Sequence, residues 1–184
     1  IVYSDSLGYK PEWLQAVENV NQLQPYRVIE LCKKILGKLK GKTVAILGLS
    51  FKPNTDDMRE APSITIINSL LKEGAKIIVY DPIAIPKAKT IFRNKINYAS
   101  SALECLKNTD CCILVTEWEE FRKLKPEDFT RNMRQPILID GRRIYDPKKF
   151  RQKLKFTAIG LGQRIESREL KSEKRDDHSH TRFS

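Results

Sequence analysis

The sequence predicts an α/β fold in which a doubly wound parallel sheet follows a helical arm. From residue 42 onward, short apolar runs alternate with amphipathic segments of helical length. The runs are nearly continuous in Val, Ile and Leu, which is typical of strands that helices cover on both faces. Repeated strand–helix–strand units with short connections build a parallel sheet through right-handed crossovers. We therefore expect a Rossmann-like sheet domain over about residues 41–163.

The helical arm occupies residues 11–39, where apolar residues recur at roughly helical spacing. Pro11 suits the first turn of a helix. Pro25 lacks an amide donor and crowds the turn before it, so the arm is either one kinked helix or two helices that meet near Gln24. The helical unit before the sheet is accordingly placed at residues 1–40.

Strands and helices alternate through the predicted sheet domain. The strands are expected at residues 43–48, 76–81, 111–118, 136–141 and 156–162. The helices are expected near residues 62–73, 85–93, 100–108, 119–125 and 146–153. The clearest helix begins at Pro62 and is ended by Gly74, because glycine often follows the last helical turn.

The polar segment 164–184 is mixed in charge and buries too little apolar surface to fold alone. We expect a disordered or loosely helical tail there. His178 and His180 could bind a metal loosely, but a solvated terminus is the simpler interpretation, and no metal site is predicted.

Composition restricts the partners that we expect. No run is long and apolar enough to span a membrane, no signal peptide is recognisable, and the chain begins without Met, so we interpret it as a fragment or trimmed product without a membrane partner. The four cysteines lack CxxC spacing, which favours reduced thiols in the cytoplasm over zinc or disulfides. They are Cys32, Cys105, Cys111 and Cys112.

The net charge of +11 would suit nucleic acid, a solvated lysine-rich surface, or a cleft for a smaller polyanion such as a nucleotide sugar. The positive charge is spread along the chain, without a basic stripe interleaved with aromatic residues and without a helix-turn-helix pattern. We therefore expect no nucleic acid partner.

Polar clusters follow three predicted strands, at residues 48–60, 116–119 and 140–143. In open α/β sheets, ligands bind beyond the carboxyl ends of the strands. Lys52 and Arg59 lie close to a helix N-terminus, which suits a ligand that carries phosphate.

Neighbouring charges could hold or extend this cationic group. Asp56 and Asp57 could fix the cations or cap local amides. Arg142 and Arg143 could supply a bidentate grip on a phosphate. The simpler alternative is a set of surface ion pairs, each of which contributes little to stability.

A dinucleotide site would require G-x-G-x-x-G in the first turn, but Gly48 is followed by LSFKP. Asp81 stands where a carboxylate would bind the ribose, although VYDP could equally open a turn. A free-standing NAD-binding domain is therefore supported only by Asp81 and the fold.

The segment GLSFKPNTDDMREAPS, residues 48–63, resembles the signature of the UDP-glucose/GDP-mannose dehydrogenase family. Four further segments continue the resemblance in the expected order over about residues 1–162. They are VENVNQLQ, EGAKIIVYDP, TEW and DGRRIYDP. The sequence NTDDMREAPS favours the UDP-glucose members of the family over those that act on UDP-N-acetylmannosamine or GDP-mannose.

The resemblance implies an enzyme that uses NAD to oxidise the C6 alcohol of a sugar twice, through intermediates bound to a catalytic Cys. It implies that an N-terminal domain carries NAD, that a C-terminal domain contributes to the UDP-sugar site, and that a central helix forms the core of a dimer. Residues 11–39 would then be the homodimer contact.

Site residues are implied by the positions that match. Phe51, Lys52 and Arg142 match substrate contacts, and Arg59 matches a residue that reaches towards NAD. Trp118 is expected to pack at a strand end. No contact is assigned to the matching helix residues, which are Asn21 and Gln24.

Three departures from the family pattern are visible. Pro25 interrupts what should be a long helix, which leaves the dimer geometry open. Ala61 stands where many relatives have Ser before the proline that opens the helix. The Gly-Gly-x-Cys-Phe-x-Lys-Asp motif and the G-x-G-x-x-G motif do not occur, so we assign no catalytic residue here. We expect a chain that is inactive alone and works with an N-terminal NAD-binding domain; the alternative is a non-catalytic module for nucleotide-sugar binding or dimerisation.

Overall fold

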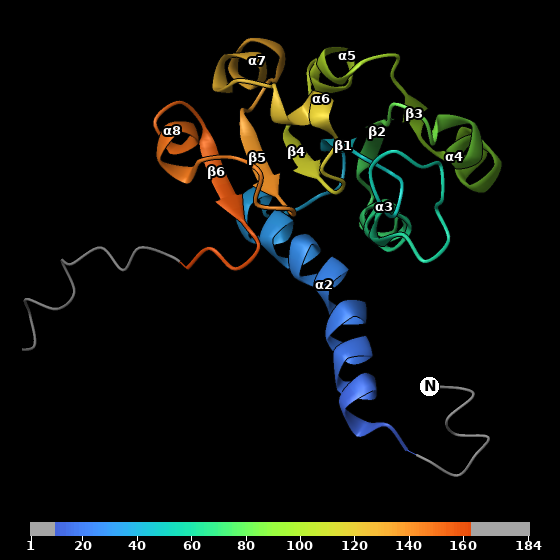
Figure 1. Cartoon of the computed structure of the whole chain (residues 1–184). Helices are drawn as coiled ribbons and strands as arrows, with labels where there is room; N and C mark the ends of the chain where they lie inside the picture. The colour runs from blue at the N-terminus through green and yellow to red at the C-terminus, as the bar shows by residue number, and fades with distance from the viewer. Residues whose placement is uncertain (1–9, 163–184) are drawn as a thin grey trace, which may run out of the picture.

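The computed structural model describes residues 10–162 (Figure 1). The predicted tail, including His178 and His180, lies outside the described residues. The strands are β1 (Thr43–Leu47), β2 (Lys76–Tyr80), β3 (Asn97–Tyr98), β4 (Cys111–Leu114), β5 (Ile137–Asp140) and β6 (Lys155–Ala158). The helices are α2 (Glu12–Leu36), α3 (Pro62–Lys72), α4 (Ile85–Phe92), η1 (Arg93–Lys95), α5 (Ala102–Leu106), α6 (Glu119–Arg122), α7 (Pro126–Asn132) and α8 (Pro147–Arg151).

The strands form one parallel sheet in the order β3-β2-β1-β4-β5-β6. The chain builds outward from β1 through β2 to β3, and then returns to the other side of β1 with β4. The direction of winding therefore reverses between β1 and β4. The predicted α/β fold, a doubly wound Rossmann-like sheet preceded by a helical arm, is confirmed.

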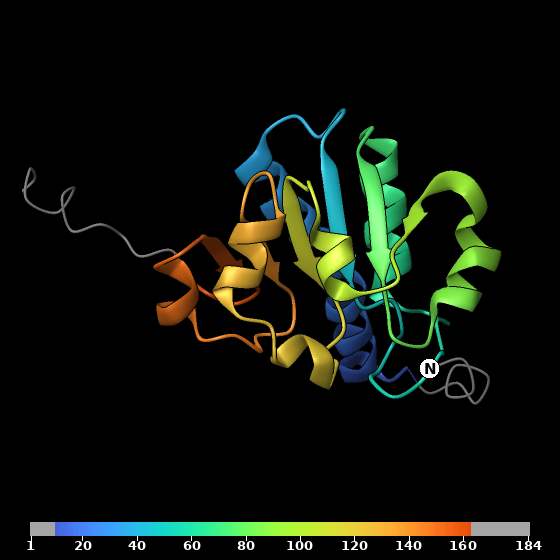
Figure 2. The ribbon, with the colours of Figure 1, turned by 90° about the horizontal axis from the view of Figure 1, so that it is seen from above.

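Two apolar layers enclose the sheet, one on each face. Val44 and Ile46 of β1 belong to the layer formed with α2, α3 and α4. Ala45 and Leu47 belong to the layer formed with the helices from α5 to α8. Figure 2 shows α5 and α7 in front of the strands and α2 and α3 behind them. Because both faces of β1 are fully buried, its sequence is continuously apolar, as predicted.

Helix α2 is a single helix with Pro25 in its interior, so the two-helix alternative was wrong. Its C-terminal half lies on the sheet, where Val28 and Cys32 are buried. Its N-terminal half extends past the carboxyl ends of the strands (Figure 1). The buried contacts of the C-terminal half offset the backbone hydrogen bond that a proline removes from a helix interior.

Strand β3 and helix α7 were not predicted, and β4 is shorter than expected. Asn97 and Tyr98 become a strand because they pair with Ile78 and Val79 of β2. Helix α7, with the sequence PEDFTRN, carries one large apolar side chain, Phe129, which is fully buried. Neither segment has the apolar periodicity from which strands and helices are recognised in a sequence.

None of the helices found between residues 10 and 162 combines the length and apolarity that a membrane crossing requires.

Helix α3 begins without a side-chain cap. Ala61 occupies the N-cap position with φ −65° and ψ 131°, and Pro62 follows it. Changing Ala61 to Ser is expected to raise the free energy of unfolding by about 1 kcal/mol, because a hydroxyl can accept from a free amide of the first turn. Urea unfolding measures this difference.

The matched control is Ser101, which caps α5 by accepting from the amide of Glu104. Changing Ser101 to Ala should lower the free energy of unfolding by a similar amount. No gain from Ala61→Ser, together with the expected loss from Ser101→Ala, would show that the buried surroundings of Ala61 do not accept the added oxygen.

Candidate functional site

The three polar clusters predicted from the sequence lie at one edge of the sheet. Strands β1, β4 and β5 are parallel neighbours, so the segments that follow them leave the sheet on the same side. The Thr116 hydroxyl donates to the Ser50 carbonyl oxygen at 2.6 Å, and Arg142 Nε donates to Glu117 Oε2. The predicted meeting of these clusters is confirmed, at the point where the winding of the sheet reverses.

The ends of β1 and β4 approach so closely that Gly48 has no room for a side chain. A Cβ atom there would lie 2.5 Å from both Cβ and N of Thr116. The φ angle of Gly48 is +91°, which residues with a side chain rarely adopt. A glycine is needed at position 48 because the ends of β1 and β4 lie so close together.

Asp81 is buried, and its carboxylate is surrounded by donors from the protein itself. Oδ1 accepts the amides of Ile83 and Ala84 at 2.9 and 2.8 Å. Oδ2 accepts from the amides of Leu49 and Ser50, the Ser50 hydroxyl and the Trp118 indole N–H. A carboxylate has about four lone-pair sites, so none remains for a ribose hydroxyl. Asp81 therefore stabilises turns, which was the alternative to ribose binding that the sequence offered.

Trp118 is only 6% exposed and contributes to the apolar layer beside α6. Its indole N–H donates to Asp81 at 3.1 Å. A buried Trp normally finds such a partner for its N–H. The prediction that Trp118 packs at a strand end is confirmed.

Phe51 and Lys52 lie together on the loop after β1. The Phe51 amide donates to the Asp57 carbonyl oxygen at 2.8 Å, which folds the loop back on itself. The Phe51 side chain is 44% exposed, and Lys52 Nζ lies 5.9 Å from the centre of its ring. Lys52 has no ion pair with another described residue, so its charge is available to a ligand.

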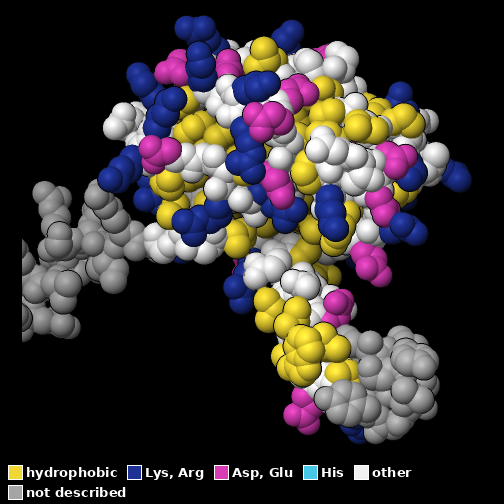
Figure 3. Space-filling view, viewed as in Figure 1, with side chains coloured by type: hydrophobic (Ala, Val, Ile, Leu, Met, Phe, Trp, Pro, Cys, Tyr) yellow, Lys and Arg dark blue, Asp and Glu magenta, His cyan; other side chains and the backbone are white. Residues whose placement is uncertain are grey.

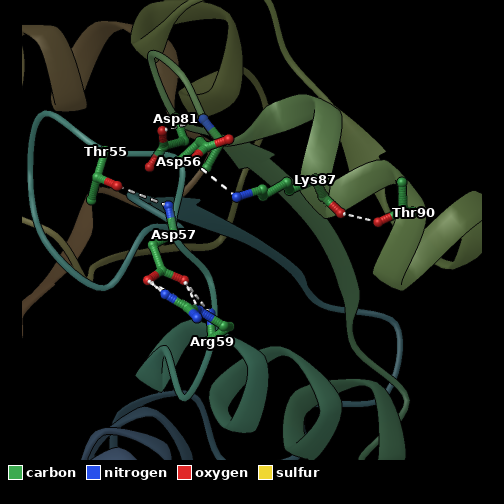
Figure 4. Close-up of polar contacts among 8 residues, drawn as sticks. Thr55, Asp56, Asp57, Arg59, Asp81, Lys87 and Thr90 are labelled. Atoms are coloured by element: carbon green, nitrogen blue, oxygen red, sulfur yellow. Dashed lines mark hydrogen bonds and ion pairs between the residues drawn. The ribbon is translucent and has the colours of Figure 1, made fainter.

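Arg59 is held by Asp57 (Figure 4). Its Nη2 and Nε atoms lie 2.8 and 3.0 Å from Asp57 Oδ2 and Oδ1, and its amide also donates to Oδ1. The hydrogen bonds from Arg59 hold the pKa of Asp57 well below its usual range. The Arg59 side chain is 89% exposed, so the pair contributes little to stability and serves mainly to fix the loop.

Asp56 pairs with Lys87 of α4 at 3.0 Å rather than with Lys52 (Figure 4). Of the two carboxylates that could have fixed the predicted cations, only Asp57 does so.

Arg142 and Arg143 have different partners, so the two side chains point to different parts of the sheet edge. Arg142 pairs with Glu117, beside the segment that follows β4. Arg143 Nη1 donates to the Gly160 carbonyl oxygen at 3.4 Å, beyond the end of β6. Arg142 alone of these two turns towards the edge between β4 and β5.

The cysteines do not reach the site. All four are buried and free. Burial raises the pKa of the Cys105 and Cys112 thiols, and a hydrogen bond with Cys32 together with burial raises that of Cys111. Protonated, buried thiols are poor nucleophiles. Within residues 10–162, no three His, Cys, Asp or Glu side chains gather in a way that could hold a metal ion.

Glu117 is the site residue that the sequence did not predict. Its position in TEW could have indicated this role. The neighbours Thr116 and Trp118 both make buried hydrogen bonds to segments that follow other strands. Gln24 of α2 keeps a buried side-chain oxygen that has no partner among the described residues.

The fold and this edge define a Rossmann-like α/β domain with cationic side chains at the carboxyl ends of its strands. The carboxylate at the ribose-binding position, Asp81, is already occupied by donors from the protein itself. Residues 45–147, more than half of the chain, match the sequence model described as "UDP-glucose/GDP-mannose dehydrogenase family, UDP binding domain". The chain belongs to the UDP-glucose/GDP-mannose dehydrogenase family.

Individual relatives agree. The chain is 36% identical over 140 residues to the UDP-glucose 6-dehydrogenase TuaD of Bacillus subtilis, covering 76% of this chain and 30% of the relative. It is 44% identical over 137 residues to the UDP-glucose 6-dehydrogenase AglM of Haloferax volcanii, covering 74% and 31%.

Among solved structures, a UDP-glucose dehydrogenase from Pyrobaculum islandicum superposes with a TM-score of 0.71 at 33% identity. The superposition covers 83% of this chain and 33% of that structure. The chain thus spans about a third of the length of the relatives that it matches.

Proposed function

We propose that this chain is the C-terminal, nucleotide-sugar-binding portion of an NAD-dependent UDP-glucose 6-dehydrogenase. The observation that carries the proposal is the convergence of the loops after β1, β4 and β5 on one edge, within the stretch that matches the family's UDP binding domain. The whole enzyme would oxidise UDP-glucose to UDP-glucuronate in two steps through a Cys-bound intermediate.

Phe51, Lys52 and Arg142 are the proposed contacts to the UDP-sugar. The Lys52 ammonium and the Arg142 guanidinium provide the charge that a diphosphate requires. The half-exposed Phe51 ring offers an apolar surface next to Lys52. Arg59, extended into solvent and fixed by Asp57, would reach NAD held by another domain.

NAD would be bound mainly by an N-terminal domain outside these residues. Asp81 supports that division, because its carboxylate is occupied by six donors and cannot take a ribose. The raised pKa values of the Cys105, Cys111 and Cys112 thiols support the expectation that this chain alone is inactive. A hydrogen bond with Cys111 lowers the pKa of Cys32, but the Cys32 side chain is fully buried. Four free cysteines also suit the cytoplasm, where thiols stay reduced.

The homodimer contact is proposed on α2, within residues 11–39. The projecting half of this helix carries five large apolar side chains that are each more than half exposed (Figure 3). They are Trp13, Val17, Val20, Leu23 and Tyr26. An apolar stripe of this kind on a protruding helix suits pairing with a second copy of the same helix.

Calorimetric titration tests the ligand assignment. The chain should bind UDP and UDP-glucose weakly, and Lys52→Ala or Arg142→Ala should each weaken binding about tenfold or more, since each removes a charge-assisted contact to phosphate. Lys87→Ala is the matched control, because Lys87 already pairs with Asp56. Binding of NAD in place of UDP would contradict the proposal.

A ligand panel in the same experiment separates the alternatives. Tighter binding of UDP-N-acetylmannosamine or GDP-mannose would assign the chain to another branch of the family. UDP binding by a chain whose gene carries its own start codon before Ile1 would instead favour a stand-alone binding module.

A further inference from the structure

Arg142 is anchored at both ends. Its backbone amide donates to Asp140 Oδ1 at 2.9 Å, and Asp140 is fully buried at the end of β5. Its side chain donates through Nε to Glu117 Oε2. The pair is about one-third exposed on each side, so solvent screens it only in part.

Glu117 is itself held in place by its two neighbours in the chain. The Thr116 hydroxyl is fully buried and donates to the Ser50 carbonyl oxygen at 2.6 Å. The Trp118 indole N–H donates to Asp81. The residues on either side of Glu117 are therefore held to the loops after β1 and β2, and the Glu117 carboxylate reaches Arg142 from a fixed segment.

The contact leaves the ligand-binding side of the guanidinium open. Glu117 engages Nε, and the two terminal nitrogens of Arg142 make no hydrogen bond with any residue from 10 to 162. Those two nitrogens form the fork that binds a phosphate or carboxylate in a bidentate manner. A guanidinium that is already oriented loses less conformational entropy when a ligand binds.

We infer that Glu117 is a positioning residue, which orients the Arg142 guanidinium towards the diphosphate of a nucleotide sugar. The inference rests on the proposed function and adds to it the residue that sets the geometry of the Arg142 contact. Glu117 carries the same sign of charge as the ligand. If Glu117 acted only by repelling the ligand's negative charge, its removal would strengthen ligand binding. If Glu117 orients Arg142, its removal would weaken ligand binding.

The test is a double-mutant cycle on the full chain, with UDP as the probe in calorimetry. Glu117→Gln should weaken UDP binding about tenfold, because the amide keeps the shape but not the charged acceptor. In an Arg142→Ala background the same change should cost less than about twofold, because nothing remains to orient. Glu119→Gln, two residues along the chain, is the control for the loss of one negative charge.

Each outcome of the cycle has a distinct meaning. Unchanged or tighter UDP binding by Glu117→Gln, or equal losses in both backgrounds, overturns the inference and leaves the proposed function standing. If the unsubstituted chain does not bind UDP, the proposed function is overturned. The proposed role of Glu117 in UDP binding is then overturned as well.

A second readout needs no ligand. The Nε–H resonance of Arg142, assigned by its loss in Arg142→Ala, should shift and exchange faster with solvent in Glu117→Gln but not in Glu119→Gln. An unchanged resonance would overturn the inference whether or not UDP binds. Equal thermal midpoints for the two glutamine variants would separate positioning from a general effect on stability.

Discussion

Changing Gly48 to Ala is expected to lower the free energy of unfolding by about 3 kcal/mol or more, through two separate costs. The φ angle of +91° is strained for any residue with a side chain, which costs about 1–3 kcal/mol. The new Cβ would also lie 2.5 Å from Cβ and N of Thr116, and overpacking of this kind costs about 1–3 kcal/mol.

Relief of the second clash requires β1 and β4 to move apart. Such a movement would lengthen the hydrogen bond from Thr116 to Ser50 and displace the loop that carries Lys52. UDP binding should therefore weaken even in the fraction of molecules that remains folded.

Gly41→Ala is the matched control for Gly48→Ala. Gly41 has a φ angle of +80°, but a Cβ there would meet nothing within 4 Å. Its substitution should cost only the backbone strain. Denaturant unfolding of both variants, with a constant dependence on urea, measures the difference. Equal losses from the two substitutions would show that the close approach of β1 and β4 relaxes at no cost.

Changing Asp81 to Asn is expected to have the second large effect, a loss of about 3 kcal/mol in the free energy of unfolding. The side chain keeps its shape, but one oxygen becomes an NH₂ group that faces donors. With the amide nitrogen at the Oδ1 position, the amides of Ile83 and Ala84 lose their acceptor. With the nitrogen at the Oδ2 position, four donors lose theirs, so the first arrangement is preferred.

Asp57→Asn provides the comparison for Asp81→Asn. It makes the same chemical change in a carboxylate whose main partner, Arg59, is exposed to solvent, and it should cost less than about 0.5 kcal/mol. Urea unfolding, followed by far-ultraviolet circular dichroism, measures both variants. A stability of Asp81→Asn within that same margin of the parent chain would refute the view that Asp81 joins the loops after β1 and β2 to Trp118.

Residues near one another in the chain account for most of what could be predicted. Pro62 and Gly74 bound helix α3 almost where the sequence placed it, because helix ends depend on local backbone chemistry. The five apolar runs became β1, β2, β4, β5 and β6. Lys52 and Arg142 were placed on the correct edge, because the carboxyl ends of parallel strands always meet there.

The features that the sequence missed or left undecided have a common physical cause. Asn97 and Tyr98 form a strand only because β2 offers unpaired hydrogen-bonding groups. Helix α2 continues through Pro25 because its C-terminal half packs on the sheet layer through Val28 and Cys32. Arg143 turns away from Arg142 to reach Gly160, which lies after β6. Each depends on a contact with a segment distant in the chain.

The sequence by itself determined the parallel α/β architecture, the edge at which the cations gather and the family, since each is encoded in local patterns and ordered motifs. Only the tertiary structure decided the long-range partners of the charged residues: Glu117 for Arg142, Lys87 for Asp56, and none among the described residues for Lys52. It also decided that Asp81 turns inward to Trp118. The direction of a side chain depends on the register of neighbouring strands and the packing of loops, and these are set only when distant segments meet.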